Sequence, residues 1–320
     1  MPKFIFTNNV DTTLAGAISP SATSLALSSA THLPNSIPAG QVLVITLNDQ
    51  ATRQNFEIIY ATEVSGATLS GLSRGQEGTA ALAWSVGDFA WSGPTAGQMA
   101  NFQPGRLLNV QYITATSTYT PTPGTANAIV EGAGGGGAGA GFPNPGSGSA
   151  AAGGGGAAGA FGKMVLSNPV ATSVVIGAGG NGVSGTAGTN GGTTSFGSLL
   201  VLPGGGGAPL ANIASIASFT GVDGQPSAPP TVVGGIGSVG YQGQQGMILS
   251  ASSGQGGAGG NSPYGSGGLI ASTNTIGSAF PGNSANGFGA GGGGAVGLGN
   301  SATEAGGNGT PGIIIVWEYT

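Results

Sequence analysis

The sequence predicts a mainly β protein, in which a small N-terminal β domain precedes a glycine-rich domain of β-strands and packed polyglycine II helices. Three observations support this fold class. Glycine supplies 69 of the 320 residues, whereas charged residues make up only 5%. Residues 1–131 hold 11 of the glycines and residues 132–320 hold the other 58. Short runs of β-branched residues, bounded by glycine or proline, recur in both parts, as is typical of strands.

The composition argues against disorder, collagen and nucleic-acid binding. Hydrophobic residues make up 39% of the chain, whereas disordered segments are usually poor in apolar residues. Collagen needs abundant proline beside its glycines, and most of the 19 prolines here lie outside the glycine runs. No lysine or arginine follows Lys163, so nucleic acid lacks its main source of affinity. A flexible linker with apolar segments remains the alternative for the second half.

The first part is expected to be an N-terminal β-rich attachment domain over residues 1–102. Residues 41–47 and 55–62 have the β-branched content of strands. A hairpin turn is expected at Ser65-Gly66, and a short helix within 94–102, where proline stands near its start. Turn residues place a linker over 103–125, and residues 126–320 form the expected polyglycine II/β tip domain.

Glycine recurs at every third position in the second part. That period is not that of an α-helix or a β-strand, but it is the period of the extended polyproline II conformation. Because such a helix has no internal hydrogen bonds, neighbouring segments must supply them, and glycine lets the backbones approach closely. The five-membered runs stand at 179, 182, 185, 188 and 191 and at 234, 237, 240, 243 and 246.

An apolar layer must accompany these helices, because ordering glycine costs about 1 kcal/mol or more per residue. Short β-rich runs between the glycine triplets are the candidates for this layer. They are residues 164–166, 174–176, 199–202 and 313–317.

One glycine run imitates a dinucleotide-binding turn. Residues 174–182, VVIGAGGNG, carry the G-x-G-x-x-G spacing. A cofactor site needs a helix directly after the turn, but the next residues carry glycine at 185, 188, 191 and 192, each unfavourable in a helix. The acidic residue expected about 20 positions later is also missing. The sequence therefore predicts no cofactor.

Catalytic and metal-binding patterns are sparse. His32 is the single histidine, so a loop role is favoured over a triad, and no cluster of metal ligands is expected. The few acids give no support to paired carboxylates for glycoside cleavage. Arg74 and Glu77 are expected in a solvated turn, where a pair across the turn would add little stability. The chain is predicted not to be an enzyme.

Aromatic residues in the glycine-rich half are the candidates for receptor binding. They lie outside the strand-like runs, and several belong to segments 210–230 and 262–288, which interrupt the glycine period. Loops on a rigid scaffold commonly carry recognition, and aromatics mixed with Ser, Asn and Gly suit binding surfaces. Sealing the glycine lattice is the equally weighted alternative. The candidates are Phe219, Tyr241, Tyr264, Phe280 and Phe288.

Two stretches resemble tailed-bacteriophage tail fibres. Residues 55–88 contain R-G-Q-E-G-T at 74–79 and W-x-x-G-D at 84–88, and resemble the attachment module at the start of many such fibres. Residues 176–180 and 194–197, with the closing run GTPGIIIVWEY at 309–319, are similar to glycine-rich fibre-tip domains. The segment over roughly 210–285 has no matching pattern.

The resemblance implies a virion tail component, a homotrimer held to a tail or baseplate protein by residues 1–102. Its tip would bind a bacterial surface receptor, which could be lipopolysaccharide, an outer-membrane protein or a pilus. A passive structural or ice-binding polyglycine-helix protein is the alternative. It would predict flat ranks of Thr or Ser and no separate attachment domain.

Overall fold

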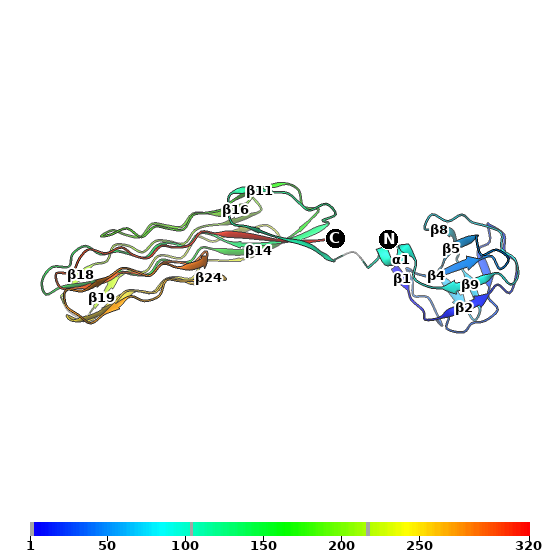
Figure 1. Cartoon of the computed structure of the whole chain (residues 1–320), viewed down its shortest axis with the longest axis horizontal. Coiled ribbons are helices and arrows are strands. Elements are labelled where there is room, and N and C mark those ends of the chain that lie inside the picture. Colours follow the sequence, from blue (N-terminus) through cyan, green and yellow to red (C-terminus); the bar gives the residue numbers. More distant parts are fainter. Residues whose placement is uncertain (1–2, 103–104, 216–217) are drawn as a thin grey trace. The chain divides into compact units, whose positions relative to one another are not determined.

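The structure, a computed structural model, describes residues 3–102, 105–215 and 218–320, with side chains 218–220 excepted. The chain divides into two compact units, Met1–Pro104 and Gly105–Thr320 (Figure 1). We describe each unit by itself. Strands hold 39% of the residues and helix 2%, which confirms the mainly β prediction. Within the described ranges, no helix is both long and apolar enough to cross a bilayer.

The first unit contains two sheets and one short helix. The larger sheet has the order β2-β9-β4-β5-β8, and β1 pairs parallel with β4. The smaller sheet has the order β3-β7-β6. The elements are β1 (Lys3–Ile5), β2 (Val10–Thr13), β3 (Ser24–Ala26), β4 (Gln41–Asn48), β5 (Phe56–Ala61), β6 (Glu63–Ser65), β7 (Thr68–Ser70), β8 (Ser73–Gln76), β9 (Phe89–Ser92) and α1 (Ala96–Ala100).

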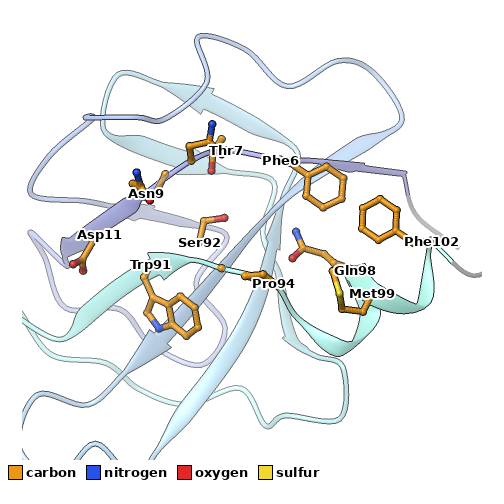
Figure 2. A pocket seen from close by; sticks show the side chains of 13 residues that line it. Phe6, Thr7, Asn9, Asp11, Trp91, Ser92, Pro94, Gln98, Met99 and Phe102 are labelled. Atoms are coloured by element: carbon orange, nitrogen blue, oxygen red, sulfur yellow. The ribbon is translucent and has the colours of Figure 1, made fainter.

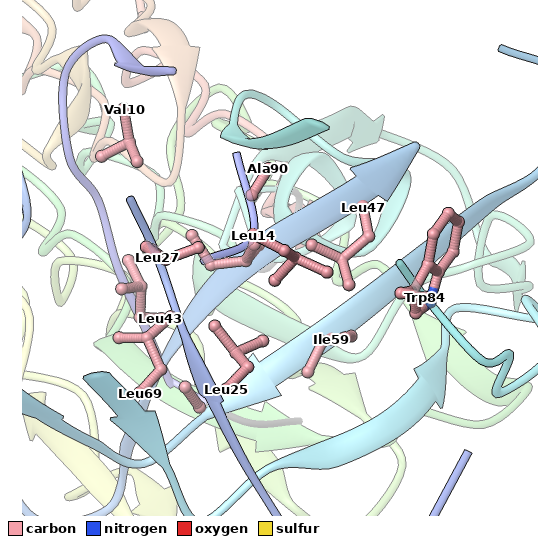
Figure 3. Close-up of a cluster of buried hydrophobic side chains, with 12 residues drawn as sticks. Val10, Leu14, Leu25, Leu27, Leu43, Leu47, Ile59, Leu69, Trp84 and Ala90 are labelled. Carbon is pink, nitrogen blue, oxygen red and sulfur yellow. The ribbon is translucent and has the colours of Figure 1, made fainter. Parts of the chain in front are cut away.

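The two sheets of the first unit enclose one apolar core (Figure 3). Leu43 and Leu47 of β4 and Ile59 of β5 contribute from the larger sheet, while Leu25 of β3 and Leu69 of β7 contribute from the smaller one. β4 is the central strand, since it pairs with β1, β5 and β9. Its residues 43–47 are buried without alternation, as is typical of a strand covered on both faces.

Sequence patterns predicted several elements of the first unit. The expected strands at 41–47 and 55–62 correspond to β4 and β5, and the expected helix within 94–102 is α1. α1 forms despite Gly97 in its first turn, because Thr95 and Gln98 make a capping box that satisfies free backbone N–H groups. The hairpin turn is wrong by one position: Ser65 pairs with Thr68, so the turn residues are Gly66 and Ala67.

Two five-stranded sheets form one end of the second unit. Their orders are β10-β29-β12-β14-β21 and β11-β15-β16-β17-β20. The strands are β10 (Leu107–Ile113), β11 (Ser117–Tyr119), β12 (Asn127–Ala133), β14 (Phe161–Ser167), β15 (Thr172–Val175), β16 (Thr194–Phe196), β17 (Leu200–Leu202), β20 (Thr231–Val232), β21 (Gly235–Ser238) and β29 (Ile313–Tyr319).

The predicted apolar layer is the core between these two sheets. Met164, Val174, Leu200 and Leu202 pack with Ile314 in one buried cluster. The strands continue directly into the glycine segments: β12 leads into 134–142, and β29 follows 304–312. The apolar core therefore lies in line with the glycine segments instead of beneath them. In Figure 1 the extended segments run side by side from these sheets towards β18 and β19.

Short strands complete the second unit. They form two four-stranded sheets, β18-β13-β28-β26 and β19-β22-β23-β25, and the antiparallel pair β24-β27. Their bounds are β13 (Ala150–Ala152), β18 (Ile213–Ala214), β19 (Ser218–Gly221), β22 (Gly246–Ser250), β23 (Ser253–Gln255), β24 (Tyr264–Ser266), β25 (Ser272–Thr273), β26 (Ala279–Phe280), β27 (Asn286–Phe288) and β28 (Val296–Leu298).

The glycine segments pack as polyglycine II helices, and segment 134–141 shows the pattern best. Successive N–H groups donate to three different neighbours in rotation. Residues 135, 138 and 141 donate to segment 186–192, residues 136 and 139 to 307–310, and residues 134, 137 and 140 to 154–160. Its carbonyls accept from three further segments, at 180, 205–211 and 292–295. A three-residue helix without internal bonds satisfies its backbone in this way.

Close backbone contact explains why these positions are glycine. A Cβ at Gly136 would overlap the carbonyl oxygen of Ala290, and one at Gly139 would overlap that of Gly293. Gly177 and Gly179 of the dinucleotide-like run face the carbonyls of Gly192 and Gly309 in the same manner. The fingerprint spacing therefore serves backbone packing, and residues 183–193 contain no helix.

Three predictions for the second unit need correction. The linker expected at 103–125 contains β10, which pairs with β29, and β11, and its Ile113 and Tyr119 belong to the buried core of the second unit. In the run 234–246, position 234 lies in a turn and 237 in β21, so only the later glycines face the lattice. Segments 210–230 and 262–288 are not free loops, since both form short strands.

Candidate binding surfaces

The R-G-Q-E-G-T turn is built around a buried carboxylate that sequence reasoning missed. Glu57 of β5 has no exposed surface, and it accepts hydrogen bonds from Arg74 Nε and Nη2, both at 2.8 Å. The Gly75 and Leu82 amides and Trp84 Nε1 also donate to it. Burial alone would raise the Glu57 pKa, but these donors hold it below its usual value.

The expected pair between Arg74 and Glu77 is wrong, and so is the solvated turn. Arg74 is mostly buried and pairs with Glu57. Glu77 instead accepts from Tyr60 Oη at 3.0 Å, from Thr95 Oγ1 at 2.7 Å and from the Gly97 amide at 2.6 Å. It therefore ties the turn to the start of α1. Burial and the Glu77 carboxylate raise the pKa of Tyr60 to about 12.

The W-x-x-G-D segment has a structural role of the same kind. The Trp84 indole reaches Glu57 at 2.7 Å, and the Asp88 carboxylate accepts from the Gln50 and Ser85 amides. Gly87 has φ of +91°, a conformation that favours glycine. Both motifs thus hold the first unit together from within.

The first unit has a pocket of about 630 Å³ between the chain before β2, the end of β9 and α1 (Figure 2). Phe6 and Phe102 stack at one end, with ring centroids 5.5 Å apart, and Met99 lies beside them in the figure. These three side chains are 48–63% exposed. Such a group of exposed apolar side chains around a pocket is typical of a contact surface.

Trp91 and Asp11 lie at the other end of the pocket (Figure 2). They are register partners in the antiparallel pair of β2 and β9, so their side chains share one face of the sheet. The indole lies over Gly93, where any Cβ would overlap its six-membered ring. Gly93 therefore leaves the space that this indole orientation needs. No periodic signal in the sequence identifies these residues, because they come from segments distant along the chain.

The five aromatic candidates of the second unit do not form one surface. Four of them lie in short strands, contrary to the expectation that they lie outside strands: Phe219 in β19, Tyr264 in β24, Phe280 in β26 and Phe288 in β27. The side chain of Phe219 lies outside the described residues. Among these strands, only those of Tyr264 and Phe288 pair with each other, and these two residues are register partners.

Tyr264 and Phe288 are partly buried and belong to the scaffold. The Tyr264 ring contacts the Phe161 ring at 6.1 Å between centroids. Burial raises the pKa of the Tyr264 hydroxyl, and the charge of Glu131 and a hydrogen bond to it add to the effect. These two aromatics thus follow the sealing alternative. In contrast, Tyr241 is 73% exposed and Phe280 is 48% exposed.

Loops meet at the end of the second unit opposite its paired ends, Gly105 and Thr320 (Figure 1). We call residues 143–149, 250–253, 274–278 and 299–303 the apical loops. The Gly299 amide bonds to the Ser149 carbonyl at 2.8 Å, and the Gly277 amide to the Leu298 carbonyl at 2.7 Å. Ile276 is 66% exposed. The turn-rich sequence NPGSGS at 144–149 could have indicated one of these loops.

Side chains suited to catalysis or metal binding are dispersed. His32 is exposed, and its Nδ1 bonds to the Asn9 carbonyl at 2.8 Å. Among the described residues, no group of three His, Asp or Glu side chains comes close enough to hold a metal ion. The Glu318 carboxylate of β29 is buried and accepts hydrogen bonds from Tyr119, Thr122 and Gln111. It therefore links β29 to β10, to β11 and to the chain that follows β11.

Comparison with known proteins identifies the second unit as a glycine-rich domain. No curated protein matches the chain. Residues 112–319 match the family described as glycine-rich domain. The matched range covers the sheets, the polyglycine segments and the apical loops, which is almost all of the second unit. The chain therefore belongs to the glycine-rich domain family.

Proposed function

We propose that the chain is a bacteriophage tail fibre protein that binds a receptor on the bacterial surface. The first unit attaches it to a tail or baseplate protein, and the apical loops of the second unit contact the receptor. The observation that carries this proposal is the set of apical loops, held at one end of a lattice of backbone hydrogen bonds. The resemblance of residues 55–88 and 309–319 to fibre modules supports the same reading.

The lattice favours binding because it fixes the bases of the loops in advance. Gly277 and Gly299 are tied to Leu298 and Ser149 by backbone hydrogen bonds, so less loop entropy is lost on binding. Ile276 and Phe280 supply exposed apolar contacts beside Ser and Asn side chains. Lipopolysaccharide, an outer-membrane protein or a pilus is the receptor class. The chain acts as a non-enzymatic virion component, in a homotrimer.

Competition for phage adsorption tests the proposal. Purified full-length chain should reduce adsorption of the phage that carries it to susceptible cells. Ile276→Ser should weaken this competition at least tenfold, because a 66% exposed apolar contact at the apical loops is lost. Val170→Ser is the matched control, since Val170 is 71% exposed in the turn before β15, at the other end of the unit. Wild-type protein without effect on adsorption would contradict a receptor role.

A passive or ice-binding glycine-helix protein is the alternative function. It predicts thermal hysteresis in the purified chain and no effect of the chain on adsorption. The separate first unit, with its own core and exposed pocket, favours the attachment role. A measured freezing-point depression beyond the colligative value would favour the alternative.

A further inference from the structure

We propose that the pocket of the first unit binds an extended peptide segment of a partner protein that presents a lysine or arginine near an aliphatic or aromatic side chain. The inference deepens the attachment role and rests on it for the identity of the protein that owns the peptide. The chemistry of the pocket itself selects the peptide, in the following steps.

One end of the pocket is suited to a cation. Asp11 is exposed and stands opposite Trp91 in the strand register, so a carboxylate and an indole border the same space (Figure 2). A lysine or arginine gains from both groups, through charge pairing and through the aromatic face. Asp11 is the one charged residue among those that line the pocket in the described part of the chain. An acidic ligand would find no lysine or arginine among these lining residues.

The other end is suited to an apolar side chain. Phe6 and Phe102 stack on each other, yet they remain 54% and 63% exposed. Met99 beside them is 48% exposed and adapts its shape readily. α1 carries Met99, and the capping box of Thr95 and Gln98 fixes the start of this helix. The apolar end is therefore held in place before any ligand arrives.

The middle of the pocket offers polar groups to a peptide backbone. Thr7 Oγ1 is buried and has no hydrogen-bond partner among the described residues. Such a hydroxyl normally finds a partner, and a rotation of the Thr7 side chain towards the pocket that it lines would bring Oγ1 within reach of a ligand amide or carbonyl. Asn9, Ser92 and Gln98 lie along the same stretch (Figure 2). A volume of about 630 Å³ is within the range of small-ligand sites and holds a few residues of an extended segment.

Titration of the full chain with three matched peptides tests the site. The probe is an acetylated and amidated pentapeptide with a central lysine, a serine on each side and a leucine at each end. In its partners the lysine is replaced by norleucine or by glutamate. The NMR signal of the Trp91 indole N–H, assigned with Trp91→Phe, reports binding. We expect the lysine peptide to bind at least tenfold more tightly than the glutamate peptide.

Variants separate the two ends of the site. Asp11→Asn should weaken the lysine peptide about fivefold to tenfold and leave the norleucine peptide unchanged. Phe102→Ala should weaken both peptides. Glu63→Gln, which removes an exposed carboxylate of the same unit, is the control and should change neither. Equal binding of the three peptides, or no shift of the Trp91 signal with any of them, would overturn the inference.

The adsorption experiment distinguishes this inference from the proposed function. The adsorption experiment measures receptor binding by the apical loops of the second unit, whereas the peptide titration measures binding to the pocket of the first unit. If the chain binds the lysine peptide selectively but does not compete for adsorption, the peptide-binding proposal is supported and the receptor role is contradicted. If the chain competes for adsorption but binds none of the peptides, the receptor role is supported and the peptide-binding proposal is contradicted.

Discussion

Glu57 and Arg74 form a two-point ion pair inside the first unit, with Oε1 to Nε and Oε2 to Nη2 both at 2.8 Å. Arg74 also donates to the carbonyls of Ser19 and Leu82. Since Glu57 belongs to β5 and Arg74 to β8, the pair joins neighbouring strands and fixes the turn that follows. A buried pair of this kind is costly to break, because the remaining charge keeps no partner.

Glu57→Gln should therefore destabilise the first unit by about 3 kcal/mol. The amide leaves the buried Arg74 charge unpaired and presents a donor where acceptors are needed. Urea unfolding of the full chain, followed by hydrogen exchange of the β5 amides, measures the loss. Glu63→Gln should stay within about 0.5 kcal/mol of wild type. A Glu57→Gln variant as stable as the control would contradict a stabilising role of the Glu57 carboxylate.

Because of the Glu57 carboxylate, we expect the first unit to lose stability at low pH. The folded-state pKa of Glu57 lies below the ordinary 4.5. At pH values between the folded-state and unfolded-state pKa, the folded chain therefore binds fewer protons than the unfolded chain. The stabilisation is complete above pH 4.5 and is lost as the pH falls through the folded-state value. Unfolding free energies from about pH 7 to about pH 3 should fall for wild type. The fall in the first unit should be clearly smaller in Glu57→Gln.

Gly136→Ala should destabilise the second unit by about 3 kcal/mol or prevent its folding. The new Cβ would overlap the Ala290 carbonyl, and both segments are held by neighbours that cannot move away. Thermal unfolding followed by circular dichroism measures the effect. Gly16→Ala is the control, since nothing lies within 4 Å of a Cβ there. Equal losses in the two variants would speak against backbone packing as the reason for glycine.

The aromatic candidates should separate into two classes. Tyr241→Ala should leave stability within about 0.5 kcal/mol, because the side chain is 73% exposed. Tyr264→Ala should cost about 3 kcal/mol, since it removes the contact with Phe161 and the hydrogen bond to Glu131. Denaturant unfolding of both variants checks the difference. Equal stability of the two would contradict the scaffold role of Tyr264.

Sequence patterns predicted elements that depend on local periodicity. β4 and β29 follow from β-branched runs, and the glycine period of three predicted the lattice. The partners within the lattice were not predictable, because backbone hydrogen bonds between glycines carry no side-chain signal. The Glu57–Arg74 pair joins positions 17 residues apart across a strand register that a pattern search does not resolve. The pocket of Trp91 and Phe6 depends on tertiary proximity alone.

The central glycine segment also constrains when the second unit can fold during synthesis. Residues 134–141 accept hydrogen bonds from amides at 292–295 and donate to carbonyls at 307–310. A nascent chain that ends before these residues leaves the middle of the lattice without its neighbours. Folding must therefore wait for the C-terminal segments, and contacts of such long sequence separation form slowly. The first unit, whose internal contacts span about a hundred residues, can fold well before translation ends.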